Sequence, residues 1–210
     1  MSDAAEPTAE RPDAPPSDPW AAYQEGLRHE VAVTRLLHPY ARQVTPALHL
    51  GEPGGPRVRL QLPPAPTHVR QARPDPYGDP VLRRDVLARL WERAEEEGLT
   101  ADGRPLLAWH VRGGTVEVVG SDLGWSGAAR LAALDRGLTS SGLCVVTPQG
   151  WVDPESGRSR SWQRLRVRGR DGSDHVRRLA RELAAADGVD GVGGSQAQVW
   201  TGSLACIRSA

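Results

Sequence analysis

Apolar residues recur at every third or fourth position in several stretches of the chain, which is the spacing of an amphipathic helix. The clearest stretch begins at Asp79-Pro80 and ends at Gly98, with apolar residues four positions apart. A helix from Asp18-Pro19 to His38-Pro39 is also predicted. Two further helices are expected, one from Ser126 as its N-cap to Gly137 and one starting at Ser173 or Asp174.

Alternation of apolar and polar residues predicts strands between these helices. Two alternating runs within residues 44–62 flank the turn-rich GEPGGP and indicate a β-hairpin. Gly113-Gly114 predicts a second hairpin, with Trp109 opposite Val118 on one face and His110 opposite Glu117 on the other. Further strands are expected at 143–146, at 162–168 and within 197–206.

This order of elements predicts an α+β fold, in which a largely antiparallel sheet is covered by helices. From residue 115 onwards the order is βαββαβ, so a ferredoxin-like arrangement of residues 115–206 is one option. The second hairpin argues against a plain version, because the first strand of that fold already has a neighbour on both sides. We expect a helix-hairpin-helix part at 19–98, containing the Pro-rich loop 63–80, to form one globular unit with an α+β part at 105–210.

The first 18 residues are rich in Ala, Pro and acidic side chains. Such a segment buries too little apolar surface to offset the entropy that ordering costs, so we expect a disordered acidic tail. No secretory signal or membrane-spanning run is recognisable. The default expectation is therefore a soluble, cytoplasmic protein with no membrane partner.

Composition excludes several classes of chemistry. All 26 basic residues are Arg, and Lys, Asn and Phe are absent, a bias typical of a high-GC bacterium. Without Lys the chain cannot form a Schiff base, nor the Walker A or kinase-type contact to ATP. Cys144 and Cys206 lie in apolar contexts and indicate buried thiols rather than a disulfide. We expect no cofactor.

The formal net charge of zero conceals an uneven distribution. Residues 1–30 contain seven acids and two Arg, whereas residues 156–181 contain nine Arg and two acids. Within this basic segment, guanidinium groups and one indole would share a face if the strand is regular: Arg158, Arg160, Trp162, Arg164, Arg166 and Arg168. This row predicts a surface for a protein, a nucleic acid or the acidic tail. The alternative is an edge strand whose charges discourage aggregation.

Seven Trp residues in a chain without Phe suggest two roles. Trp91 and Trp109 lie on predicted apolar faces and are expected in the core. Trp125, Trp151 and Trp162 adjoin Gly, Ser or Pro and are expected to be partly exposed, which is favoured at interfaces.

We therefore expect a non-enzymatic adaptor that engages a protein partner through Trp-bearing loops, Trp151 included, and the arginine row. Nucleic-acid binding through residues 162–168 is the alternative. The pattern does not define the oligomeric state.

Two weaker candidates concern catalysis and metal binding. His110 opposite Glu117 would supply an oriented imidazole for general-base chemistry, so a small enzyme is the third option. An ordinary cross-strand polar pair is the simpler interpretation. Asp171, Asp174 and His175 carry groups that ligate metals, but Asp and Ser are also favoured helix caps. No metal site is expected.

Overall fold

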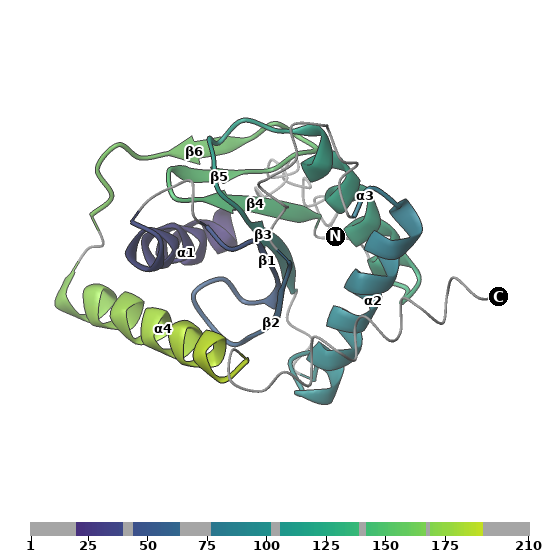
Figure 1. Cartoon of the computed structure of the whole chain (residues 1–210), viewed down its shortest axis with the longest axis horizontal. Coiled ribbons are helices and arrows are strands. Elements are labelled where there is room, and N and C mark those ends of the chain that lie inside the picture. Colours follow the sequence, from purple (N-terminus) through teal and green to yellow (C-terminus); the bar gives the residue numbers. More distant parts are fainter. Residues whose placement is uncertain are drawn as a thin grey trace, which may run out of the picture.

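One six-stranded sheet forms the centre of the molecule, with helices on both of its faces (Figure 1). The computed structural model describes residues 20–39, 44–63, 77–101, 106–138, 142–166 and 169–190. The strands are β1 Ala47–Gly51, β2 Arg57–Gln61, β3 Leu107–Val111, β4 Leu143–Thr147, β5 Gly150–Val152 and β6 Ser159–Ser161. The helices are α1 Gln24–Leu37, α2 Pro80–Glu96, α3 Gly120–Leu134 and α4 Gly169–Asp190, and a 3₁₀ turn at Ala21–Tyr23 precedes α1.

The sheet has the strand order β2-β1-β3-β4-β5-β6. All neighbouring strands are antiparallel except β3 and β4, which are parallel and are connected through α3. The predicted α+β class with a largely antiparallel sheet is confirmed. Because β1 pairs with β3, strands from residues 19–98 and from residues 105–210 belong to the same sheet.

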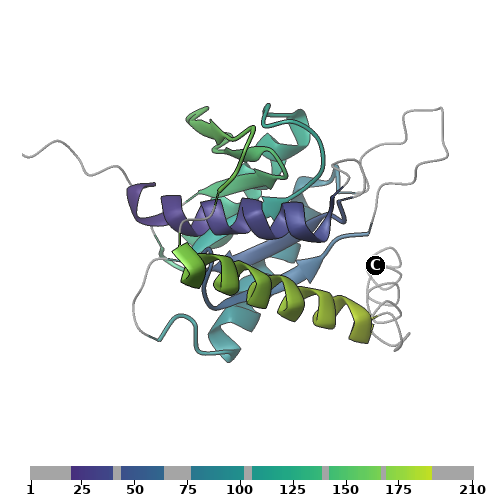
Figure 2. The ribbon, with the colours of Figure 1, turned by 90° about the vertical axis from the view of Figure 1, so that its left-hand side faces the viewer.

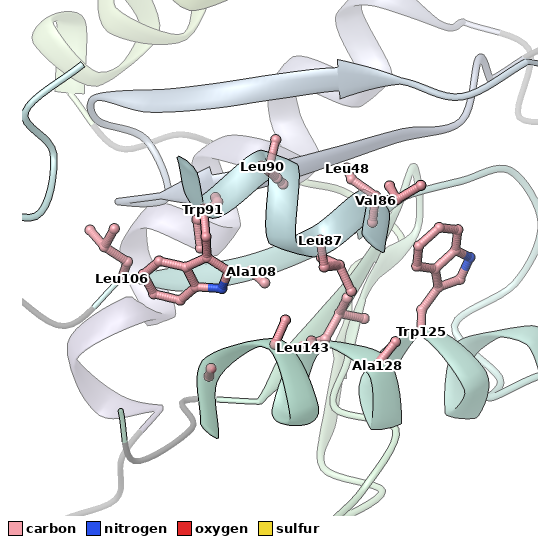
Figure 3. Close-up of a cluster of buried hydrophobic side chains, with 14 of the residues drawn as sticks. Leu48, Val86, Leu87, Leu90, Trp91, Leu106, Ala108, Trp125, Ala128 and Leu143 are labelled. Atoms are coloured by element: carbon pink, nitrogen blue, oxygen red, sulfur yellow. The ribbon is translucent and has the colours of Figure 1, made fainter. Parts of the chain in front are cut away.

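Alternation along the strands gives each face of the sheet its own core. Leu48 and Leu143 point towards α2 and α3, where they pack with Leu87, Trp91 and Trp125 (Figure 3). The opposite face lies under α1. The core there comprises Leu27 and Val31 of α1 together with strand residues Leu107, Trp109, Cys144, Val146 and Trp151. Figure 2 shows α4 beside α1 on this face. The two helices pack through Val33, Val176, Leu179 and Ala180.

Local sequence signals account for the clearest elements. Asp79 caps α2, because its side chain accepts a hydrogen bond from the Val81 backbone N–H (2.9 Å), and Pro80 occupies the first turn. The predicted hairpin within 44–62 is formed by β1 and β2, and the predicted strand at 143–146 lies within β4. Among the described residues, no helix is long and apolar enough to cross a membrane.

The second predicted hairpin is wrong. Residues 112–119 form a loop that leads into α3, and of the two glycines expected in the turn only Gly114 has a positive φ (+92°). Both edges of β3 are already occupied, by β1 and β4, so no edge is free to pair with residues 115–119. The strand with which the ferredoxin-like option would begin is therefore this loop, and its final strand, 197–206, lies outside the described residues.

Three other boundaries also differ from the prediction. The expected strand 162–168 is wrong, because the edge strand β6 ends at Ser161 and residues 162–166 follow it as a loop. α3 begins at Gly120 rather than at Ser126, which lies within the helix and donates to Glu155 (3.0 Å). α4 begins at Gly169, so Ser173 and Asp174 are not its N-cap. The expected tail 1–18 lies outside the described residues.

Candidate interaction site around Trp162

Arg160 and Trp162 lie together at the outer edge of the sheet. Arg160 is exposed on β6, where it pairs in register with Trp151 of β5. Its guanidinium donates to Gln24 Oε1 (3.2 Å) and lies 5.3 Å from the centroid of the Trp162 ring. A guanidinium over an indole is a cation–π contact, so the half-buried Trp162 side chain is held between α1 and the strand edge.

The arginines around Trp162 are exposed, although they do not share one regular strand face. Arg158 precedes β6, and Arg164 and Arg166 belong to the loop that follows it. We call the set Arg158, Arg160, Trp162, Arg164 and Arg166 the arginine surface. Within the described part of the chain, Arg160, Arg164 and Arg166 form no ion pair with a carboxylate. Arg168, the last of the predicted row, lies outside the described residues.

A cleft of ≈ 630 Å³ opens beside Trp162. It lies between the C-terminal end of α1, the β4–β5 turn and the residues at the end of β6. Its lining comprises Arg35, His38, Pro39, Pro148, Gln149, Ser161, Trp162 and Gln163. Arg35 donates from Nε to the Pro148 carbonyl and from Nη2 to the Trp162 carbonyl, so one side chain connects three segments. Sequence patterns pointed to Trp162 but not to Arg35.

Two of the three tryptophans expected at the surface are in the core. Trp151 is 4% exposed and stacks on Trp20, with the ring centroids 6.0 Å apart. Trp125 is 2% exposed and lies against Tyr77 on the opposite side of the sheet. The prediction of exposed Trp125 and Trp151 side chains is therefore wrong, whereas Trp91 and Trp109 are buried as expected. Of the three tryptophans expected to be partly exposed, Trp162 alone lines the cleft.

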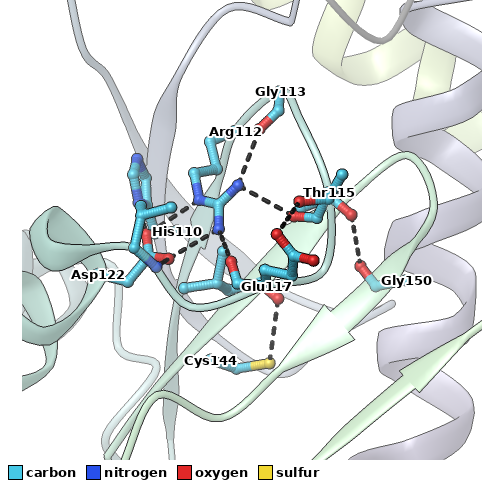
Figure 4. Close-up of polar contacts among 11 residues, drawn as sticks. His110, Arg112, Gly113, Thr115, Glu117, Asp122, Cys144 and Gly150 are labelled. Carbon is cyan, nitrogen blue, oxygen red and sulfur yellow. Dashed lines mark hydrogen bonds and ion pairs between the residues drawn. The ribbon is translucent and has the colours of Figure 1, made fainter.

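The expected pair of His110 and Glu117 does not form. His110 is buried beneath α3, with Nδ1 3.9 Å from Asp122 Oδ1, whereas Glu117 lies in the exposed loop after β3 (Figure 4). The Glu117 carboxylate is 3.4 Å from Thr115 Oγ1. The cross-strand pair fails for the same reason as the hairpin, because strands β1 and β4 already occupy both edges of β3.

Arg112 and Asp122 instead form the main polar cluster in this region. Two hydrogen bonds join them, Nε to Oδ1 (2.9 Å) and Nη2 to Oδ2 (2.7 Å). Arg112 also donates to the carbonyls of Gly113, Thr115 and Glu117, so it fixes the loop before α3 (Figure 4). These contacts hold the loop in place at the start of α3.

The three residues considered as metal ligands have separate surroundings. Asp174 pairs with Arg177 (3.5 Å), and His175 Nε2 lies 2.7 Å from the Gly54 carbonyl oxygen. Asp171 is exposed in the first turn of α4. Within the described residues, no group of three His, Cys, Asp or Glu could hold a metal ion. The His175 contact instead attaches α4 to the β1–β2 turn.

His49 is a buried histidine on the face of the sheet under α1. Its ring stacks on Trp109 with the centroids 5.0 Å apart. Burial lowers the pKa of His49 well below 6.5, and the nearby charges of Arg57 and Arg59, together with His110, lower it further. The pKa of His29, beside α4, is also lowered, mainly by burial. A lowered pKa favours the neutral form of both imidazoles.

Acidification is expected to destabilise the protein through His49. Below pH 6.5 the unfolded chain binds a proton on this residue, whereas the folded chain does not until the pH reaches its lowered pKa. The free energy of unfolding should therefore fall by up to about 1.4 kcal/mol per pH unit in this window. Urea unfolding at about pH 7.5 and about pH 5.5 measures this loss. The loss should be smaller in His49→Phe than in the wild type; equal losses would contradict the assignment.

Comparison with the models of known protein families, with curated proteins and with solved structures finds no match for this chain.

Proposed function

We propose that the protein is a non-enzymatic interaction module that binds an acidic segment of a protein partner at the arginine surface. The observation that supports this most directly is a set of three exposed arginines, Arg160, Arg164 and Arg166, without carboxylate partners in the described part of the chain. Clustered cations of one sign attract an acidic partner and speed its association.

The edge of the sheet supports the same proposal. Among the strands of the described residues, β6 pairs with β5 alone, so no described strand covers its outer edge. An extended peptide can add to such an edge by main-chain hydrogen bonds, while side-chain contacts provide specificity. Here those contacts would come from the arginines and from the cleft beside Trp162.

Nucleic-acid binding is the second candidate and the weaker one. A base would need an accessible indole face on which to stack. Arg160 already lies over the Trp162 ring, at 5.3 Å from its centroid, and so competes with a base for that face. A polypeptide carboxylate, by contrast, can pair with the guanidinium groups and leave this contact in place.

Reversing two charges on the arginine surface is expected to weaken peptide binding about tenfold, because each exposed charge pair contributes up to about 1 kcal/mol. The probe is a fluorescein-labelled peptide of alternating Glu and Thr residues, titrated by fluorescence anisotropy at low salt. The variant is Arg164→Glu/Arg166→Glu, whose side chains are exposed in the loop after β6.

The matched control is Arg89→Glu/Arg93→Glu, which changes the net charge equally on α2, on the other face of the sheet. This control should bind the peptide within about twofold of the wild type. Equal weakening in both variants would show a nonspecific charge effect and contradict the proposal. Tighter binding of single-stranded RNA than of the peptide would favour the nucleic-acid candidate instead.

A further inference from the structure

Arg35 lines the cleft, and one nitrogen of its guanidinium, Nη1, has no hydrogen-bond acceptor among the described residues. Its Nε and Nη2 donate to the carbonyls of Pro148 and Trp162, which hold the guanidinium in place. Nη1 donates to no described residue, and it is not among the buried atoms that lack a partner. Because Arg35 lines the cleft, Nη1 is the nitrogen through which a ligand can reach this cation.

The charge of Arg35 is also uncompensated within the described part of the chain. No described carboxylate forms an ion pair with it, and both of its acceptors are neutral carbonyls. Burial lowers the pKa of Arg35, which means that the site disfavours an isolated positive charge. An anion bound at Nη1 would offset this penalty, so the cleft favours a negatively charged ligand.

We infer that the cleft is a carboxylate-binding subsite, in which Arg35 anchors one acidic group of the segment bound along β6. This inference rests on the proposed function and adds to it a specific contact between Arg35 and the bound segment. The arginine surface attracts the acidic segment, and Arg35 holds one carboxylate by a charge-assisted hydrogen bond from Nη1. Gln149 and Gln163, both at the cleft, carry amides that can also donate to the ligand.

The bound carboxylate could come from an acidic side chain or from the C-terminus of a chain. Residues 1–18 of this chain, with five acids and one Arg, are one source of acidic side chains. The described chain begins at Trp20, which packs on Trp151 next to β6, so this source is joined to the protein beside the strand along which the segment is proposed to bind. Linking a weak ligand in this way raises its effective concentration.

The test places a carboxylate in the cleft itself. Gln149→Glu adds an acidic group of nearly the same shape at an exposed position and keeps Arg35, which holds three segments together. The matched control is Gln61→Glu, which makes the same change at the exposed end of β2, on the opposite edge of the sheet. The full chain serves as the receptor, with and without each substitution.

Three probes distinguish the sources of the carboxylate. The first is the Glu-Thr peptide with an amidated C-terminus, the second is a Gln-Thr peptide with a free C-terminus, and the third is a peptide of residues 1–18. We expect Gln149→Glu to weaken the first and third probes about tenfold, and Gln61→Glu to leave them within about twofold. Weakening confined to the Gln-Thr peptide would assign the subsite to a C-terminal carboxylate.

Equal binding of all probes by Gln149→Glu and Gln61→Glu would overturn the subsite. If Arg164→Glu/Arg166→Glu still weakened binding, the proposed function would survive that result. Sodium acetate provides a probe that does not depend on β6. Its titration should shift the Nε–H resonance of Arg35 in the parent chain and not in Gln149→Glu; the absence of any shift would also contradict the subsite.

Discussion

Replacing Asp122 with Ala is expected to lower the free energy of unfolding by about 3–5 kcal/mol, as is typical when one partner of a buried ion pair is removed. The Asp122 side chain is 0% exposed and accepts two hydrogen bonds from Arg112. It also accepts one from the Val119 backbone N–H (3.0 Å), which stabilises the first turn of α3. The substitution would leave the Arg112 guanidinium, 12% exposed, without its carboxylate.

Asp135→Ala is the matched control. Asp135 pairs with Arg84 at 2.6 Å, but both side chains are more than 40% exposed. Solvent screens such a pair, so its loss should cost less than about 1 kcal/mol. Urea unfolding near neutral pH measures both variants. Similar losses in the two would contradict the importance assigned to the Arg112–Asp122 cluster.

Gly26→Ala is expected to destabilise the protein by about 1–3 kcal/mol, whereas Gly127→Ala should stabilise it by about 0.5–1 kcal/mol. Both glycines lie within helices, where Ala is intrinsically preferred. A Cβ at Gly26 would lie 2.0 Å from the Pro53 carbonyl oxygen of the β1–β2 turn, and this backbone cannot move away cheaply. A Cβ at Gly127 meets nothing within 4 Å.

Thermal and urea unfolding of the two variants measure these opposite changes in the free energy of unfolding. Stabilisation in both would mean that α1 does not approach the β1–β2 turn as closely as described. Destabilisation in both would mean that the outer face of α3 is not open at Gly127.

Elements with local signals could be predicted from the sequence. The Asp-Pro start of α2, the apolar spacing of α1 and the turn-rich centre of the first hairpin each act within a few residues, and each is confirmed. The second hairpin failed because a Gly-Gly turn signal cannot reveal that β1 and β4, distant in sequence, occupy both edges of β3. Long-range pairing outweighed the local preference.

The candidate site was likewise predicted only where its signals are local in sequence. The arginine-rich segment was recognised, but alternation placed its strand at 162–168, beyond β6. Gly150 next to Trp151 suggested a loop, whereas the glycine is needed because a Cβ there would lie 2.0 Å from the Arg160 carbonyl oxygen of β6. Arg35 had no sequence signal, because its acceptors are more than 100 residues away along the chain.

The most direct test of the central claim is to map the bound acidic peptide on the protein. Backbone amide shifts of the ¹⁵N-labelled chain, recorded while the amidated Glu-Thr peptide is added, locate the contact. We expect the largest shifts at residues 158–166 of β6 and its following loop, with further shifts at Gln149 and Arg35 in the cleft. Shifts centred on α2 and α3, with β6 unchanged, would contradict binding at the arginine surface.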